Sequence, residues 1–161
     1  MTTPHTVSRT GTVAAPVGDV FQAGLSLPLP QLYARRYGLI PAIVAVRDQQ
    51  GEWGTVGQTR VFETADRGAM REELLTIDRP HGFSNRLTVL GGPFLPLVGT
   101  IEESWTFREA GGATQATWEW NLYPCSRAGR LLAPVVGRMW LGYAGRVLEQ
   151  LSYEVTGSRN S

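Results

Sequence analysis

The chain has 161 residues, and its 15 basic and 14 acidic side chains give a formal net charge of +1. This length most simply forms one domain, expected over residues 1–161 with an ordered core of about 6–156, and the near-neutral charge predicts no general attraction to nucleic acid or to anionic membranes. All 15 basic residues are arginine, and the lack of lysine excludes Schiff-base chemistry and a lysine nucleophile.

The chain begins with a strand and two short helices. Residues 6–14 alternate weakly between apolar and polar side chains and predict a strand. Pro16 suits the first turn of a helix, and apolar residues follow it at helical spacing. The prolines within 26–30 end that helix, and a second short helix is predicted over 31–37.

Turn signals rich in glycine, proline and aspartate then recur at regular intervals. They separate six further runs of strand length, and connections this short predict an antiparallel meander. The runs cover about 40–47, 55–65, 69–78, 83–90, 98–109 and 113–123.

The last two predicted strands alternate most clearly between apolar and polar residues. A period of two predicts that one face of the sheet is buried and the other meets water. The buried face is expected to carry Ile101, Glu103, Trp105 and Phe107 from one strand and Thr114, Ala116, Trp118, Trp120 and Leu122 from the next.

A long helix is predicted over about 127–155, with a kink or a fresh start at Pro134, which lacks the amide for a mid-helix hydrogen bond. Its apolar residues recur at helical spacing and form one arc. That arc comprises Val136, Trp140, Ala144, Val147, Leu148 and Leu151, with Leu141 and Tyr143 at its shoulders.

The order of these elements resembles that of the START/Bet v1-like (helix-grip, SRPBCC) superfamily. The local sequence is similar to the polyketide cyclase/dehydrase-type branch of that superfamily over nearly the whole chain. The pieces that carry the resemblance are Ala15-Pro16-Val17 with Val20-Phe21, Val56-Gly57-Gln58-Thr59-Arg60, Glu72, Asp78-Arg79-Pro80, Phe83, Trp105-Thr106-Phe107, Gly112-Ala113-Thr114, Trp118 and Pro124.

The resemblance implies an α+β helix-grip fold, in which a curved seven-stranded antiparallel sheet wraps around the long C-terminal helix, with two short helices after the first strand. It also implies a cavity between sheet and helix.

The chain departs from the family pattern at Asn85, where many relatives have an aromatic residue. The residues expected to contact a ligand are Asn85, Phe94, Trp105, Phe107, Trp118, Val136, Met139, Trp140, Tyr143 and Val147.

Glu103 is the strongest candidate for chemistry, because a carboxylate on an apolar face has a raised pKa and can serve as a general acid or base. The alternatives are that a bulge turns Glu103 outward or that an arginine pairs with it. Glu72 and Glu73 must face opposite sides of their strand, and Arg60 on the neighbouring strand is a partner for the one that faces inward. Such a cross-strand Arg–Glu pair is more often structural than catalytic. The Tyr143 hydroxyl is either a donor to a ligand carbonyl or a core hydroxyl that reaches the surface.

Three functions fit these features. The first is binding of a hydrophobic small molecule, lipid-like or polyketide-like. The second is a cyclase or dehydratase that uses Glu103 or Glu72 with Arg60 or Tyr143. The third is a protein-interaction module that uses the outer surface or the apolar segment 91–98. If it is not a partner contact, that segment is either a lid over the cavity or folded back onto the core.

The sequence carries no metal-ligand spacing and no motif for a cofactor, so none is expected. No signal peptide or membrane span is visible, and Cys125 is the single cysteine, which is compatible with a reducing cytoplasm. We expect a cytoplasmic monomer or homodimer with no stable membrane insertion and no nucleic-acid partner.

Overall fold

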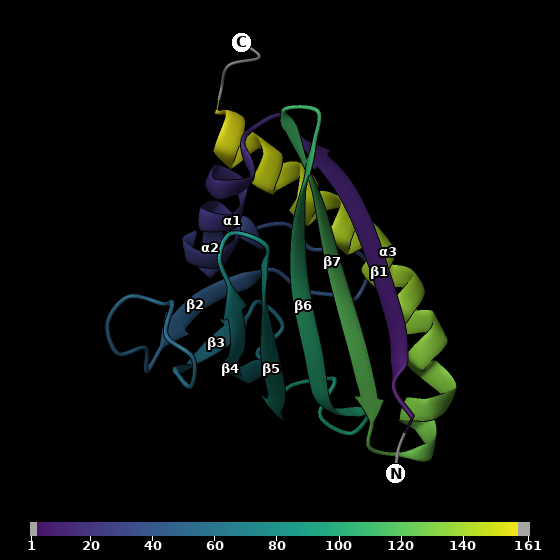
Figure 1. Cartoon of the computed structure of the whole chain (residues 1–161). Coiled ribbons are helices and arrows are strands. Elements are labelled where there is room, and N and C mark those ends of the chain that lie inside the picture. Colours follow the sequence, from purple (N-terminus) through teal and green to yellow (C-terminus); the bar gives the residue numbers. More distant parts are fainter. Residues whose placement is uncertain (1–2, 158–161) are drawn as a thin grey trace.

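The structure is a computed structural model that describes residues 3–157. A curved sheet faces one long helix, and two short helices follow the first strand (Figure 1). In chain order the elements are β1 (His5–Val13), α1 (Val17–Ser26), α2 (Leu29–Leu32), β2 (Ile43–Arg47), β3 (Thr59–Thr64), β4 (Ala69–Asp78), β5 (Gly82–Gly91), β6 (Val98–Ala110), β7 (Ala113–Pro124) and α3 (Arg127–Thr156).

All seven strands form one antiparallel sheet in the order β1-β7-β6-β5-β4-β3-β2. Six consecutive strands are therefore a meander, and β1 joins its far edge beside β7. In Figure 1, α3 runs alongside β1 behind the sheet. The expected α+β helix-grip fold is confirmed.

Three boundaries differ from the sequence-based expectation. The second helix spans Leu29–Leu32 rather than 31–37, because Pro30 sits in its first turn and the chain then turns through Gly38, whose φ is +58°. The second strand begins at Ile43 and the third at Thr59, because Pro41 and the turn at Gly57 delay regular pairing. The long helix is continuous through Pro134, so a fresh start there is wrong.

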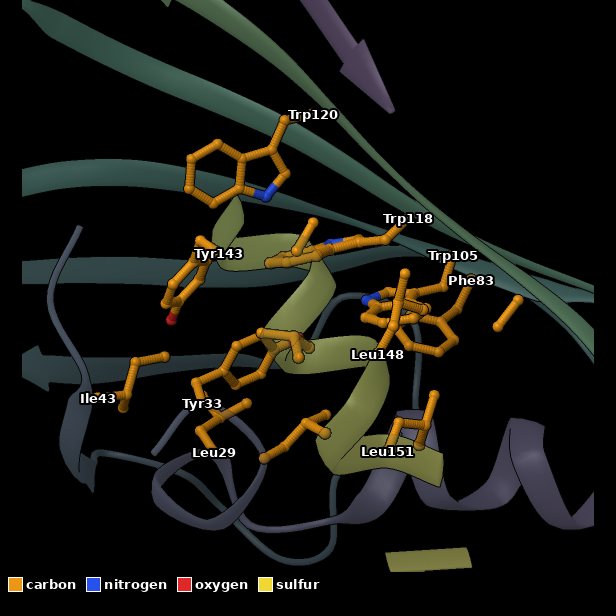
Figure 2. Packing of buried hydrophobic residues seen from close by; sticks show 14 of the residues in the cluster. Leu29, Tyr33, Ile43, Phe83, Trp105, Trp118, Trp120, Tyr143, Leu148 and Leu151 are labelled. Carbon is orange, nitrogen blue, oxygen red and sulfur yellow. The ribbon is translucent and has the colours of Figure 1, made fainter. Parts of the chain in front are cut away.

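Aromatic side chains from the sheet and from α3 fill the centre of the molecule. The rings of Trp105 and Trp118 stack with centroids 5.2 Å apart, and Trp140 of α3 lies 5.0 Å from Trp118. Figure 2 shows Trp105 and Trp118 side by side between sheet and helix. These contacts hold α3 against the sheet.

The start of α3 is tied to the segment that connects β5 and β6. Ser126 caps the helix by accepting a hydrogen bond from the Gly129 amide at 3.0 Å, and its hydroxyl donates to the Pro96 carbonyl at 2.7 Å. The Cys125 amide donates to the Leu97 carbonyl at 3.0 Å. Segment 91–98 is therefore anchored at its C-terminal end.

We predict that Gly129→Ala destabilises the fold although alanine is the better helix former. A Cβ at Gly129 would collide with the backbone carbonyl oxygen of Leu97, whereas a Cβ at Gly18 in α1 would meet nothing within 4 Å. The free energy of unfolding, measured by urea denaturation, should fall by about 1–3 kcal/mol for Gly129→Ala and rise by up to about 1 kcal/mol for Gly18→Ala. Equal stabilisation by both substitutions would contradict the close approach of Leu97 to α3.

Candidate functional site

The space between sheet and helix holds a cavity of about 50 Å³. This is far below the roughly 300–1,000 Å³ of a typical ligand site, so it has room for a few water molecules or one small chemical group. The deep cavity expected from the sequence is largely filled by the aromatic core. The lining residues are Leu29, Tyr33, Ile40, Pro41, Ile43, Phe62, Thr64, Met70, Glu72, Leu87, Glu103, Trp118, Trp120 and Tyr143, and we call this the inner cavity.

Glu103 lies buried at the wall of the inner cavity. Strand alternation in β6 turns it to the same side as Trp105, and its neighbours across the sheet are Asn85 and Trp120. Its carboxylate accepts hydrogen bonds from Asn85 Nδ2 at 3.0 Å, Trp118 Nε1 at 3.1 Å and Trp120 Nε1 at 3.2 Å. Within residues 3–157 it forms no ion pair.

Burial, and then the negative charge of Glu72, together raise the pKa of Glu103 to about 7, although the three N–H donors oppose the shift. Asn85 is buried as well, and in the described part of the chain its Oδ1 has no hydrogen-bond partner. A protonated Glu103 would need an acceptor, and a rotated Asn85 amide supplies one. The two side chains can thus accommodate both protonation states.

Arg60 and Glu72 form a buried pair across β3 and β4, with 2.6 Å between Nε and Oε2. Arg60 also donates to Gln49 Oε1 at 3.2 Å and lies over the Trp53 ring at 3.9 Å. Glu72 borders the inner cavity, but Arg60 does not, because its guanidinium is turned toward Trp53. Glu73 faces outward, 3.7 Å from Arg86.

Two tyrosines complete the polar part of the inner cavity. Tyr33 follows α2, Tyr143 comes from α3, and their rings stack with centroids 6.5 Å apart. Burial, and then the charge of Glu103, raise the pKa of both phenols well above the ordinary value. Both therefore stay neutral and can donate a hydrogen bond to an oxygen atom.

A much larger hollow lies beside the inner cavity and opens to the surface. It measures about 750 Å³, and Pro41 lines both hollows. We call it the outer groove. Its walls are Ala34, Arg36, Gly38, Leu39, Pro41, Ala42, Ala65, Asp66, Pro93, Phe94, Leu97, Leu132, Val135, Val136 and Met139.

The structure divides the residues expected to contact a ligand into three groups. Phe94, Val136 and Met139 line the outer groove, and Trp118 and Tyr143 line the inner cavity. Asn85 lines neither hollow, but it donates a hydrogen bond to Glu103, which lines the inner cavity. The remaining four border neither hollow, because the packing of sheet against helix encloses them: Trp105, Phe107, Trp140 and Val147.

Sequence reasoning missed several lining residues. Tyr33 fell inside a wrongly placed helix, and Leu39 and Pro41 belong to the densest apolar stretch of the chain. Leu132 and Val135 lie outside the main apolar arc of the long helix, yet they remain apolar and half exposed. Apolar residues on the exposed side of a helix were the signal that could have found the outer groove.

The described residues, 3–157, contain no group of three or more His, Cys, Asp or Glu side chains placed to hold a metal ion. In the same part of the chain, no helix is both long and apolar enough to cross a membrane.

The family model described as "Polyketide cyclase / dehydrase and lipid transport" matches residues 4–155. A search of curated proteins returned no significant match. Among solved structures, a major latex-like protein from Panax ginseng superposes with a TM-score of 0.70 at 14% identity, with 94% of this chain and 97% of that one covered.

Two further solved structures share the fold. Ara h 8.0201 has a TM-score of 0.66 at 18% identity, covering 95% of this chain and 98% of that one. Protein Ms6760 from Mycobacterium smegmatis has a TM-score of 0.67 at 20% identity, covering 96% and 92%.

We predict that Glu103 makes stability depend on pH. Its folded pKa of about 7 lies above the ordinary value of 4.5, so the folded state binds more protons than the unfolded state between those values. The contribution of Glu103 to the free energy of unfolding is therefore fully present below about pH 4.5 and is lost as the pH rises to about 7. This contribution amounts to about 3 kcal/mol.

The measurement is urea denaturation of the wild type and of Glu103→Gln from pH 4 to 8. The difference in unfolding free energy between the wild type and Glu103→Gln should change between about pH 4.5 and 7 and stay constant outside this range. Glu102→Gln is the matched control, because Glu102 lies next to it on the outer face, 3.4 Å from Arg86. A difference for Glu103→Gln that stays constant across the window would show that Glu103 does not titrate there.

Proposed function

This chain belongs to the polyketide cyclase/dehydrase and lipid transport family, and we propose that it binds a hydrophobic small molecule, lipid-like or polyketide-like, in the outer groove. The observation that carries the proposal is the groove itself. Its volume of about 750 Å³ falls within the range of small-molecule sites, and aliphatic side chains with one phenylalanine form most of its wall.

The inner cavity would receive one end of that ligand. It adjoins the groove at Pro41 and offers two neutral phenol hydroxyls and the carboxyl group of Glu103. A cavity of about 50 Å³ admits a carbonyl or hydroxyl group but not a ring system. The ligand that suits both hollows is therefore an apolar body with an oxygen function at one end.

A second candidate function is acid–base catalysis on such a ligand, as in a cyclase or dehydratase. The observation in its favour is the buried position of Glu103 at the wall of the inner cavity, where burial and the charge of Glu72 raise its pKa to about 7. A general acid or base works best when its pKa lies near the working pH. In this scheme Glu103 moves a proton, and Tyr33 or Tyr143 donates to a carbonyl oxygen where negative charge develops. Arg60 takes no part, since it does not border the inner cavity.

Binding is tested with Nile red, an uncharged dye that fluoresces in apolar surroundings. Leu132→Arg places a charge in the groove wall and should weaken dye binding at least about tenfold. Leu131→Arg is the matched control, because Leu131 is the adjacent residue and lies outside the groove wall. Equal affinities of the two variants would remove the outer groove as the binding site.

Catalysis is tested with a short poly-β-ketone thioester, whose cyclisation is followed by absorbance of the aromatic product. Glu103→Gln should lower any protein-dependent rate by about 10²–10⁴-fold and leave Nile red affinity unchanged, because it removes the proton donor and keeps the shape. Glu102→Gln should retain the wild-type rate. An undiminished rate for Glu103→Gln would rule out Glu103 as the acid or base.

A further inference from the structure

Exposed aliphatic side chains lie in the wall of the outer groove or next to wall residues in the sequence. Leu131 is 80% exposed and Leu39 76%, while Val135 and Leu95 are 54% and 47% exposed. Leu95 and Leu131 lie outside the wall of the groove, so a ligand in the groove would leave them in water. Ligand binding therefore accounts for Leu39 and Val135, which line the groove, but not for Leu95 and Leu131.

The first half of α3 presents these aliphatic residues together with arginines. At 100° per residue, Arg127, Leu131, Val135 and Arg138 fall within an arc of about 80° on the side away from the core. All four side chains are exposed. The start of α3 is joined to the Leu95 segment, since Cys125 Sγ donates to the Leu95 carbonyl at 3.6 Å.

The rim face is defined by Leu39, Leu95, Leu131, Val135, Arg127 and Arg138. The chain has no acidic residue from 120 to 148, a stretch with four arginines. Among the described residues, Arg36, Arg127, Arg130 and Arg138 form no ion pair with any carboxylate. Asp66 of the groove wall is acidic, and its carboxylate accepts hydrogen bonds from the Thr64 hydroxyl and the Gly68 amide.

We propose that the rim face docks on the surface of a membrane that contains anionic phospholipid. The proposal rests on the function proposed above, because a groove that opens at the docked face can exchange a hydrophobic ligand with the lipid. A helix face that combines aliphatic residues with arginine is suited to the interface between acyl chains and phosphate groups. Arg127 and Arg138 form no ion pair within the described residues, so both guanidinium groups are available to lipid phosphates.

The test is flotation of the full chain with vesicles of phosphatidylcholine alone or with about one third phosphatidylglycerol. The wild type should float with the anionic vesicles at low salt and detach as the salt concentration rises. Leu131→Asp should reduce partitioning about tenfold or more, since it replaces an inserted side chain with a negative charge. Val44→Asp is the matched control, because Val44 is 55% exposed on β2, outside the rim face, and it should bind as the wild type.

The arginine contribution is measured separately. Arg127→Gln and Arg138→Gln should each weaken partitioning about fivefold. Arg108→Gln, at the far end of β6, should have no effect. Failure of the wild type to bind anionic vesicles, or wild-type partitioning by Leu131→Asp, would overturn the docking proposal and leave a protein partner as the remaining occupant.

Nile red binding without vesicles separates this proposal from the function on which it rests. Leu131→Asp should bind the dye with wild-type affinity, since Leu131 does not line the groove. Loss of flotation with retained dye binding supports docking by the rim face. Absence of dye binding in the wild type would overturn the ligand-binding function, whatever the vesicles show.

Discussion

The arrangement of the whole interior depends on one buried carboxylate. Glu103 receives hydrogen bonds from the indole nitrogens of Trp118 and Trp120 and from the Asn85 amide, all of which project from neighbouring strands. A buried indole N–H without an acceptor is costly, so Glu103 permits two tryptophans to lie side by side on the concave face of the sheet. Their orientation then fixes where Trp105 and Trp140 stack.

This packing determines where the molecule has room. Four tryptophan rings between sheet and helix leave an inner cavity of about 50 Å³. The larger hollow lies at the opening, among the loop before β2, the β3–β4 turn, segment 91–98 and the first half of α3. Any ligand of lipid size must therefore lie mainly in the outer groove, and the buried carboxylate can meet only its end.

Strand alternation and helical spacing were sufficient to predict the sheet and the long helix, because those patterns follow directly from backbone geometry. Alternation also placed Glu103 on the inner face, but it could not exclude a bulge that turns this residue outward. Alternation could not choose between Glu72 and Glu73, since leucine stands at both 74 and 75; a bulge between Leu74 and Thr76 lets the strand accommodate both. The second helix was misplaced because Pro30 was assigned to the break rather than to the first turn. The sequence pattern could not predict that the inner cavity is small. Its volume depends on how the side chains of Trp105, Trp118 and Trp140 pack together in three dimensions.

The stretch from 120 to 148 carries a charge of +4, and the whole chain carries +1, so all remaining residues together carry 1 − 4 = −3. A near-neutral isoelectric point of about 7.9 thus conceals one strongly positive segment. A negatively charged surface would attract this segment more strongly than the rest of the chain, before any contact forms. Its approach to that surface would be oriented, with the positive helix leading, even though the net attraction on the molecule as a whole is small.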